Sequence, residues 1–367
     1  MPKRSECWKR PSVIIVCHEE VLFIGTNYTK TVENALNHVR DGKFTEIQIP
    51  VPWGHISGLW YGDRSIQPLI ALHGWLDNSG TFAKLAPLLV EAAGSVLCID
   101  LPGHGRSSHL PAGILYHIAE FIRVLTRIMQ YYNWSKISLL GHSMGGGVCL
   151  YFASLYPSKV DFLISIDVVI RRINKPNFAV KALRYTMEKA LRDNQRLVDD
   201  TSNEEPPSYT FAECERRLYE ASGRSILLEN CKYILERNIS KSRIFADRYY
   251  FSRDTRLKYI MDQQSVEALG KAMAMRICAA KLPYMVLRGG ASSNIGPDSL
   301  KIIGWLTEDN PNFETHLIAD GLHHFHLNQP EATANLIIPF LKRYRPQSLG
   351  DGAQSDVSSE LRSKAKL

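Results

Sequence analysis

A serine lies between closely spaced glycines in the stretch Leu139-Leu140-Gly141-His142-Ser143-Met144-Gly145-Gly146-Gly147. Residues 137–140 form a short apolar run typical of a buried strand, and residues 146–156 have the pattern of a helix. Gly-x-Ser-x-Gly at such a junction is typical of a tight strand-to-helix turn that lifts a serine hydroxyl clear of the sheet. Glycine is needed on both sides because larger side chains would collide across the turn. The stretch predicts that Ser143 is a nucleophile and that the backbone amide of Met144 faces an oxyanion.

Strands and helices alternate on both sides of this turn. We expect strands over residues 45–51, 55–61, 69–72, 96–100, 137–140, 162–166, 283–287 and 313–318. We expect helices over residues 79–93, 115–132, 146–156, 299–307 and 331–344. This alternation predicts an α/β fold with a mostly parallel central sheet flanked by helices.

The 367 residues are enough for one large α/β domain with an insertion. We predict a core made of residues 44–167 and 281–345. Residues 168–280 break the strand–helix alternation, and we interpret them as an inserted helical cap. Residues 1–43 are predicted to be a poorly ordered N-terminal extension, and it stays open whether this extension is genuine. Residues 346–367 are polar and are predicted to form a disordered tail.

The composition argues against several classes of protein. The net charge of +7 is mild, and no dense basic run with interleaved aromatic residues indicates a nucleic-acid partner. No apolar run is long enough to predict a membrane span. The 7 cysteines are scattered and include no Cys-x-x-Cys pair, so neither a zinc site nor a disulfide framework is expected.

The chain ends in a tripeptide that resembles a targeting signal, Ala365-Lys366-Leu367. Its small-basic-leucine pattern is a conservative form of the Ser-Lys-Leu address read by the peroxisomal import receptor. We therefore expect this receptor as a partner and the peroxisome as the location, with a cytoplasmic or perinuclear pool left open.

Two further motifs supply groups that an acyl-transfer site requires. His73-Gly74-Trp75 follows a predicted central strand, at the place where a second oxyanion amide, that of Trp75, is expected. Gly321-Leu322-His323 follows the last strand, seven residues before Pro330. This spacing favours His323 as the general base over its two histidine neighbours.

Those neighbours, His324 and His326, are interpreted as packing or hydrogen-bonding residues. A His-x-x-His pair formed by His323 and His326 lacks a third ligand, so we expect no metal site. The expected chemistry also needs no cofactor.

The third member of the predicted triad is unsettled. The turn after residues 283–287 is the usual place for the acid, but residues 288–294 read Arg-Gly-Gly-Ala-Ser-Ser-Asn and contain no carboxylate. Asp167, at the end of the strand over residues 162–166, is our first candidate, and Asp298 is the alternative acid. A polar or absent third member is also left open.

The order of these motifs resembles the α/β-hydrolase superfamily. More narrowly, three segments resemble the serine hydrolase-like (kraken-type) family: Val51-Pro52-Trp53-Gly54-His55-Ile56, His73-Gly74-Trp75-Leu76-Asp77-Asn78 and Ser252-Arg253-Asp254-Thr255-Arg256-Leu257. The likeness runs from about residue 44 to residue 345. It implies a hydrolase associated with peroxisomes and supplies no substrate.

The sequence thus predicts a carboxylesterase-like serine hydrolase. Ser143 is expected to form an acyl-enzyme from a small-molecule ester or thioester, with His323 as general base. The alternative is a non-catalytic protein of the same fold that binds a small molecule or a partner.

Overall fold

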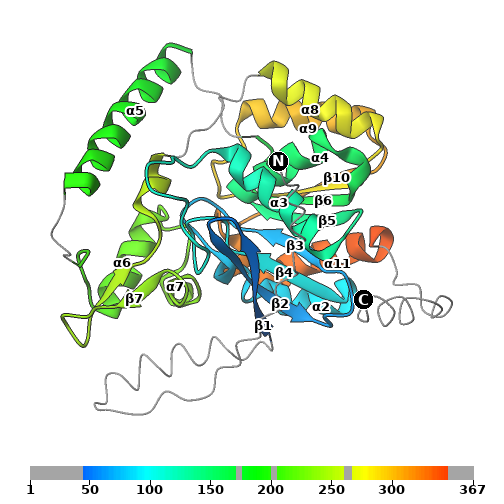
Figure 1. The fold of residues 1–367 in the computed structure, drawn as a ribbon. Coiled ribbons are helices and arrows are strands. Elements are labelled where there is room, and N and C mark those ends of the chain that lie inside the picture. Colours follow the sequence, from blue (N-terminus) through cyan, green and yellow to red (C-terminus); the bar gives the residue numbers. More distant parts are fainter. Residues whose placement is uncertain (1–43, 171–175, 200–204, 260–266, 346–367) are drawn as a thin grey trace, which may run out of the picture.

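An eight-stranded sheet lies at the centre of the computed structural model, which describes residues 44–170, 176–199, 205–259 and 267–345 (Figure 1). The strand order is β1-β2-β4-β3-β5-β6-β9-β10. The strands are β1 (Phe44–Val51), β2 (Gly54–Gly62), β3 (Leu69–Leu72), β4 (Ser95–Ile99), β5 (Ile137–His142), β6 (Val160–Ile166), β9 (Tyr284–Gly289) and β10 (Phe313–Ile318). The predicted extension over residues 1–43 and tail over residues 346–367 lie outside the described residues.

The central strands are apolar throughout because both faces of the sheet are covered. All residues of β3, Leu69–Leu72, are buried, as are all residues of β4 and β5. From β4 to β10 neighbouring strands pair in parallel, whereas β2 pairs antiparallel with both β1 and β4. The predicted mostly parallel sheet is confirmed.

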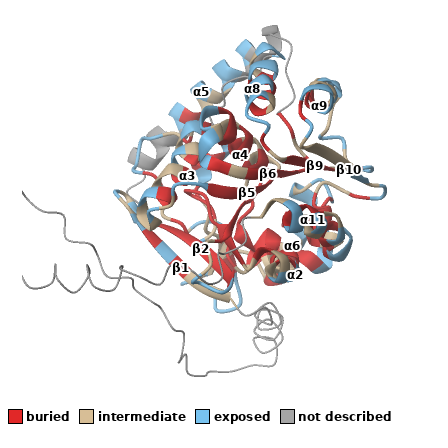
Figure 2. Ribbon diagram, turned by 90° about the vertical axis from the view of Figure 1, so that its right-hand side faces the viewer, coloured by how far each residue is buried: buried red, intermediate tan, exposed pale blue. Residues whose placement is uncertain are grey.

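Helices pack on the two faces of the sheet in separate apolar clusters (Figure 2). One face carries α3 (Ile118–Tyr132), α4 (Met144–Leu155), α8 (Glu267–Ala279) and α9 (Pro297–Asp309). The other face carries α2 (Leu85–Ala93), α10 (Phe325–Asn328) and α11 (Pro330–Tyr344). Because parallel strands end at one edge, this layering brings the loops after β3, β5, β6, β9 and β10 to the same side of the molecule.

The helix predicted over residues 79–93 is divided in the structure. A 3₁₀ turn, η2 (Ser79–Phe82), comes first, and α2 begins at Leu85. Pro87 favours a helix that begins here, because proline has no amide hydrogen and is accommodated best in the first turn of a helix, where Pro87 lies.

A cap is inserted between β6 and α8, and much of it has a core of its own. Its elements are α5 (Pro176–Asp199), α6 (Phe211–Ala221), η4 (Leu228–Asn230), α7 (Cys231–Leu235), β7 (Ile239–Lys241), β8 (Tyr249–Phe251) and η5 (Thr255–Tyr259). A separate apolar cluster joins α6 and α7 to β8 through Phe211, Ile234 and Tyr249.

The structure differs from the sequence prediction in two features of this insertion. The strands β7 and β8 pair antiparallel but have only three residues each, too few to show an alternating pattern. The helix α8 falls within the predicted cap over residues 168–280, yet it packs on the core. Its residues Met273 and Ile277 belong to the same apolar cluster as Val148 of α4.

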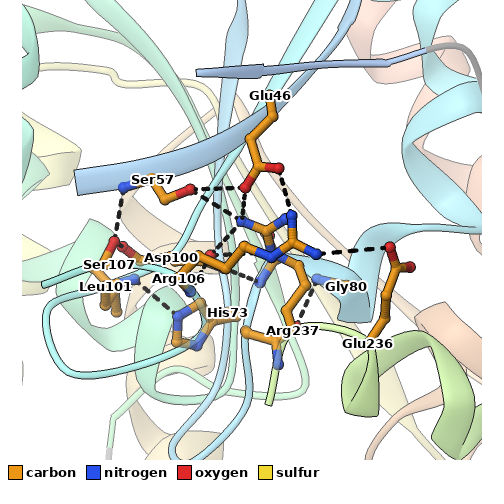
Figure 3. A network of polar contacts seen from close by, with 12 residues as sticks. Glu46, Ser57, His73, Gly80, Asp100, Leu101, Arg106, Ser107, Glu236 and Arg237 are labelled. Atoms are coloured by element: carbon orange, nitrogen blue, oxygen red, sulfur yellow. Dashed lines mark hydrogen bonds and ion pairs between the residues drawn. The ribbon is translucent and has the colours of Figure 1, made fainter. Parts of the chain in front are cut away.

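A buried arginine from the cap enters the core at the end of α7 (Figure 3). The Arg237 guanidinium lies 2.6 Å from Asp100 Oδ2 and 2.9 Å from Glu46 Oε1. Asp100 also accepts hydrogen bonds from the backbone amides of Ser79 (2.8 Å) and Arg106 (2.9 Å). Burial alone raises the pKa of Asp100, but Arg237 outweighs this effect and holds the pKa at about 2. The pair therefore joins the cap to the loop that follows β4.

Replacing this arginine is expected to lower stability sharply. Arg237→Met leaves the Asp100 carboxylate buried without its cation, which typically costs about 3–5 kcal/mol. Arg106→Gln is the matched control, since Arg106 pairs with the same Glu46 from an exposed position, where ion pairs contribute about 0–1 kcal/mol. Urea unfolding followed by circular dichroism measures both. Equal losses in the two variants would contradict a special role for Arg237.

Candidate active site

The predicted strand-to-helix turn carries Ser143 in a strained backbone conformation between β5 and α4. Its φ of 51° and ψ of −120° lie in a region that residues other than glycine rarely adopt. A Cβ atom on Gly141 would lie 2.5 Å from the backbone of Gly145 and Gly146, and one on Gly145 would lie 2.2 Å from the Leu72 carbonyl oxygen. The glycines are therefore required for the turn to pack against β3.

Ser143 and His323 line one cavity of about 860 Å³ between the core and the cap. This volume is in the range of small-molecule sites. Core residues Trp75, Met144 and Asp167 also line it, and the cap contributes residues from α5, the end of α6 and η5: Thr186, Ala221, Ser222, Gly223, Ser225 and Lys258. The cap therefore forms part of the walls of the cavity.

The imidazole of His323 is hydrogen-bonded to Asp167. His323 Nδ1 donates to Asp167 Oδ2 at 2.7 Å. The carboxylate is fully buried, whereas the imidazole is one-fifth exposed. Because Nδ1 is engaged with the carboxylate, Nε2 is the ring nitrogen left for proton transfer.

Asp167 is held in place by the loop that follows β9. Its Oδ1 accepts from the backbone amide of Gly289 (3.0 Å), and its Oδ2 accepts from the hydroxyl of Ser292 (2.5 Å). The side-chain amide of Asn294 also contacts His323 Nδ1. The loop without a carboxylate thus supplies hydrogen bonds that position the aspartate, and the side chain of Asn294 lies beside the ring of the histidine.

No role for Ser292 or Asn294 was predicted from the sequence, although the polar residues in the loop over 288–294 were a visible sign that it could form hydrogen bonds. The alternative acid Asp298 lies in the first turn of α9. The structure thus brings Asp167, and not Asp298, into contact with the ring of His323.

The two residues expected to supply oxyanion amides, Trp75 and Met144, line the same cavity as Ser143. Met144 is the first residue of α4, and the first intrahelical bond of that helix runs from Gly147 N to Ser143 O (3.1 Å). The amide of Met144 precedes this bond, so it is among those left for a ligand. Trp75 follows β3, and its indole Nε1 donates to the carbonyl of Leu257 in η5 (2.9 Å). This bond ties the Trp75 loop to the cap.

Three buried histidines, His142, His324 and His326, lie close to one another and to the base. The ring centroid of His142 lies 4.5 Å from that of His323, 4.7 Å from that of His324 and 4.1 Å from that of His326. Burial lowers the pKa of His142 and His324 well below the ordinary value and lowers that of His326 to about 3. These imidazoles are therefore neutral at physiological pH. His326 Nε2 bonds to Thr81 Oγ1 at 2.8 Å, and His324 Nδ1 bonds to Ser225 Oγ at 2.8 Å.

An α/β sheet with a strained serine after a central strand, a histidine after the last strand and a cap between them defines the class of α/β hydrolases. The family model described as "alpha/beta hydrolase fold" matches residues 67–330, so the chain belongs to this family. The fold class expected from the sequence is confirmed.

Proteins with similar sequences indicate a narrower group within the α/β hydrolases. The chain is 33% identical over 313 residues to a "Probable serine hydrolase" of Drosophila melanogaster, an alignment that covers 84% of this chain and 91% of the relative. It is 31% identical over 311 residues to a "Serine hydrolase-like protein" of Danio rerio, covering 82% of this chain and 90% of the relative. The predicted resemblance to the serine hydrolase-like proteins is confirmed.

A solved structure shares the fold. A hypothetical protein of Pseudomonas aeruginosa superposes with a TM-score of 0.66 at 24% identity, covering 80% of this chain and 98% of that protein.

Within the part of this chain that the structure describes, no helix has both the length and the apolar character needed to cross a membrane.

Proposed function

We propose that this protein is a serine hydrolase that cleaves an ester or thioester through an acyl-enzyme formed on Ser143. One observation carries the proposal. His323 is bonded at 2.7 Å to the buried carboxylate of Asp167, and it lines the same cavity as a serine held on a strained turn. A serine, a histidine and a buried acid in such an arrangement are the groups that acyl transfer requires.

The proposed reaction has two steps, acylation of Ser143 and hydrolysis of the acyl-enzyme. In the first, Ser143 Oγ attacks the acyl carbon while His323 Nε2 takes the serine proton. The amides of Trp75 and Met144 stabilise the negative oxygen of the tetrahedral intermediate. Collapse of this intermediate releases the alcohol or thiol, which receives the proton from His323, and leaves the acyl group on Ser143. In the second step, water attacks the acyl-enzyme with His323 again as base, and the products are the carboxylic acid and free enzyme.

Asp167 acts through the histidine in both steps. Its carboxylate keeps the proton on His323 Nδ1, so that Nε2 faces the reaction, and it stabilises the imidazolium that forms. The bonds from Gly289 and Ser292 fix this carboxylate before substrate binds. In this mechanism, side chains and backbone amides of the protein supply every catalytic group.

The non-catalytic alternative rested on the absence of an acid after residues 283–287. The contact between Asp167 and His323 favours the enzyme over this alternative. Turnover separates the two: we expect the purified protein to hydrolyse a short p-nitrophenyl ester and the thioester of the same acyl chain. Saturable binding of both compounds with no release of nitrophenol or thiol would favour the binding protein.

We further propose import into peroxisomes through the tripeptide Ala365-Lys366-Leu367, which lies outside the described residues. Removing it is expected to move a protein tagged at its amino end from peroxisomes to the cytosol, because the import receptor reads only the free carboxyl terminus. Fluorescence microscopy beside a peroxisomal marker measures the change. The control is Ser363→Ala, which leaves the tripeptide intact. An unchanged distribution after the deletion would make the match a coincidence.

A further inference from the structure

A second group of buried polar side chains lies beside Ser143 and His323, and two of its members line the same cavity. The residues are Asp77 on the loop after β3, His142 at the end of β5 and His324 on the loop before α10. Asp77 Oδ2 lies 4.0 Å from His142 Nδ1 and 3.7 Å from His324 Nε2. The three side chains are nearly or fully buried. Asp77 Oδ2 and His142 Nδ1 have no hydrogen-bond partner among the described residues.

The hydrogen bonds of His142 determine which of its ring nitrogens carries the proton. His142 Nε2 lies 3.0 Å from the carbonyl oxygen of His323, and a carbonyl can only accept a hydrogen bond. Nε2 therefore carries the hydrogen, and Nδ1 is left with a free lone pair. That lone pair is on the nitrogen nearest to Asp77 Oδ2.

The same reasoning applies to His324. The hydroxyl of Ser225 donates its hydrogen to the carbonyl of Ser222 (2.7 Å), so its oxygen accepts from His324 Nδ1 (2.8 Å). Nδ1 carries the ring hydrogen, and His324 Nε2 has a free lone pair. When Asp77 is ionised, two imidazole lone pairs and one carboxylate oxygen converge with no hydrogen between them. Lone pairs in this arrangement repel one another unless a cation lies among them, either a metal ion or a proton on Asp77, whose pKa burial raises to about 7.

We propose that Asp77, His142 and His324 bind a divalent transition-metal ion of the Zn²⁺ type. Two imidazole nitrogens and a carboxylate oxygen are ligands that Zn²⁺ takes at about 2.0–2.2 Å, which places ligand atoms about 3.4 Å apart in a tetrahedral site. The separations of 3.7 and 4.0 Å from Asp77 Oδ2 are longer than this, and all three candidate ligand atoms lie within 4.8 Å of one another. Imidazole ligands favour such an ion over Mg²⁺ or Ca²⁺, which prefer oxygen.

This ion would join the three segments on which the active site is built. His142 precedes Ser143, His324 follows His323, and Asp77 lies two residues after Trp75. No metal is expected from the sequence, because the pair with metal-ligand spacing formed by His323 and His326 lacks a third ligand. The proposal does not depend on the proposed function, since a non-catalytic protein with these residues would bind the ion equally.

Metal binding by the full-length protein tests this inference. Protein first treated with a chelator is titrated with Zn²⁺ in a calorimeter, and Co²⁺ is bound in a parallel experiment to report ligand geometry by its visible absorption. We expect one ion per chain and a higher melting temperature in its presence, since a ligand that binds only the folded state stabilises it. Asp77→Asn is expected to weaken binding at least about 100-fold, because losing an outer-shell partner alone costs about 10–100-fold.

A half-buried pair on β10 provides the matched control. His316 Nε2 lies 3.4 Å from Glu314 Oε1, so His316→Gln removes an imidazole–carboxylate pair of similar spacing without touching the buried group. This variant is expected to bind Zn²⁺ as the unaltered protein does. If Asp77→Asn fails to fold by circular dichroism, His324→Gln takes its place. Failure of the unaltered protein to bind the ion, or equal affinity in the buried-site variant, would overturn the proposal. Ester turnover by metal-free protein tests the proposed function separately.

Discussion

Hydrolysis of a short p-nitrophenyl ester is expected to fall about 10⁶-fold in the Ser143→Ala variant. The reason is that alanine offers no oxygen to form the acyl-enzyme, so His323 and the oxyanion amides have no nucleophile to assist. Losses of about this size accompany removal of a triad serine in other hydrolases. Steady-state release of nitrophenol by purified protein measures the effect, and circular dichroism checks that the variant folds.

Ser293→Ala is the matched control for this experiment. Ser293 lines the same cavity but lies exposed on the loop after β9. We expect nearly unaltered turnover in this variant. If activity persisted in Ser143→Ala and disappeared in Ser293→Ala, Ser293 would be the nucleophile and the assignment to Ser143 would be wrong.

The Asp167→Asn variant is expected to lose about 10⁴-fold in kcat. Its amide group has nearly the shape of the carboxylate, and its oxygen still accepts the bond from Gly289. It fails, however, to stabilise the imidazolium of His323 and favours the wrong tautomer of the ring. Turnover of the ester at saturating concentration measures the loss.

Asp298→Asn serves as the control and as the test of the alternative acid. Asp298 lies in the first turn of α9, and its replacement is expected to leave kcat nearly unchanged. A large loss in Asp298→Asn combined with normal turnover in Asp167→Asn would show that the acid is Asp298. Similar small effects in both would mean that His323 works without an acidic partner.

The sequence predicts the parts of the fold that depend on local patterns. The short strands are recognisable because burial on both faces makes them continuously apolar, as in Leu69–Leu72. The turn at Ser143 is recognisable because only glycine fits beside it. The pairing of β7 with β8 has no such signal, since three-residue strands are too short for any period.

Contacts between distant residues are harder to predict. Asp167 and His323 are 156 positions apart, and the strand-end position made Asp167 only one of two candidate acids. Arg237 meets Asp100 across 137 positions, and nothing in the sequence around Arg237 distinguishes it from a surface arginine. The buried group around Asp77 is a similar case, because its members come from three separate segments of the chain.

The most direct test of the central claim is the position of a fluorophosphonate adduct in the unaltered protein. This reagent reacts readily only with an activated serine, and digestion followed by mass spectrometry identifies the modified residue. We expect one adduct per chain on Ser143 in the folded protein, and no adduct when the protein is unfolded before the reagent is added. An adduct on a different serine, or no adduct on folded protein, would contradict this expectation.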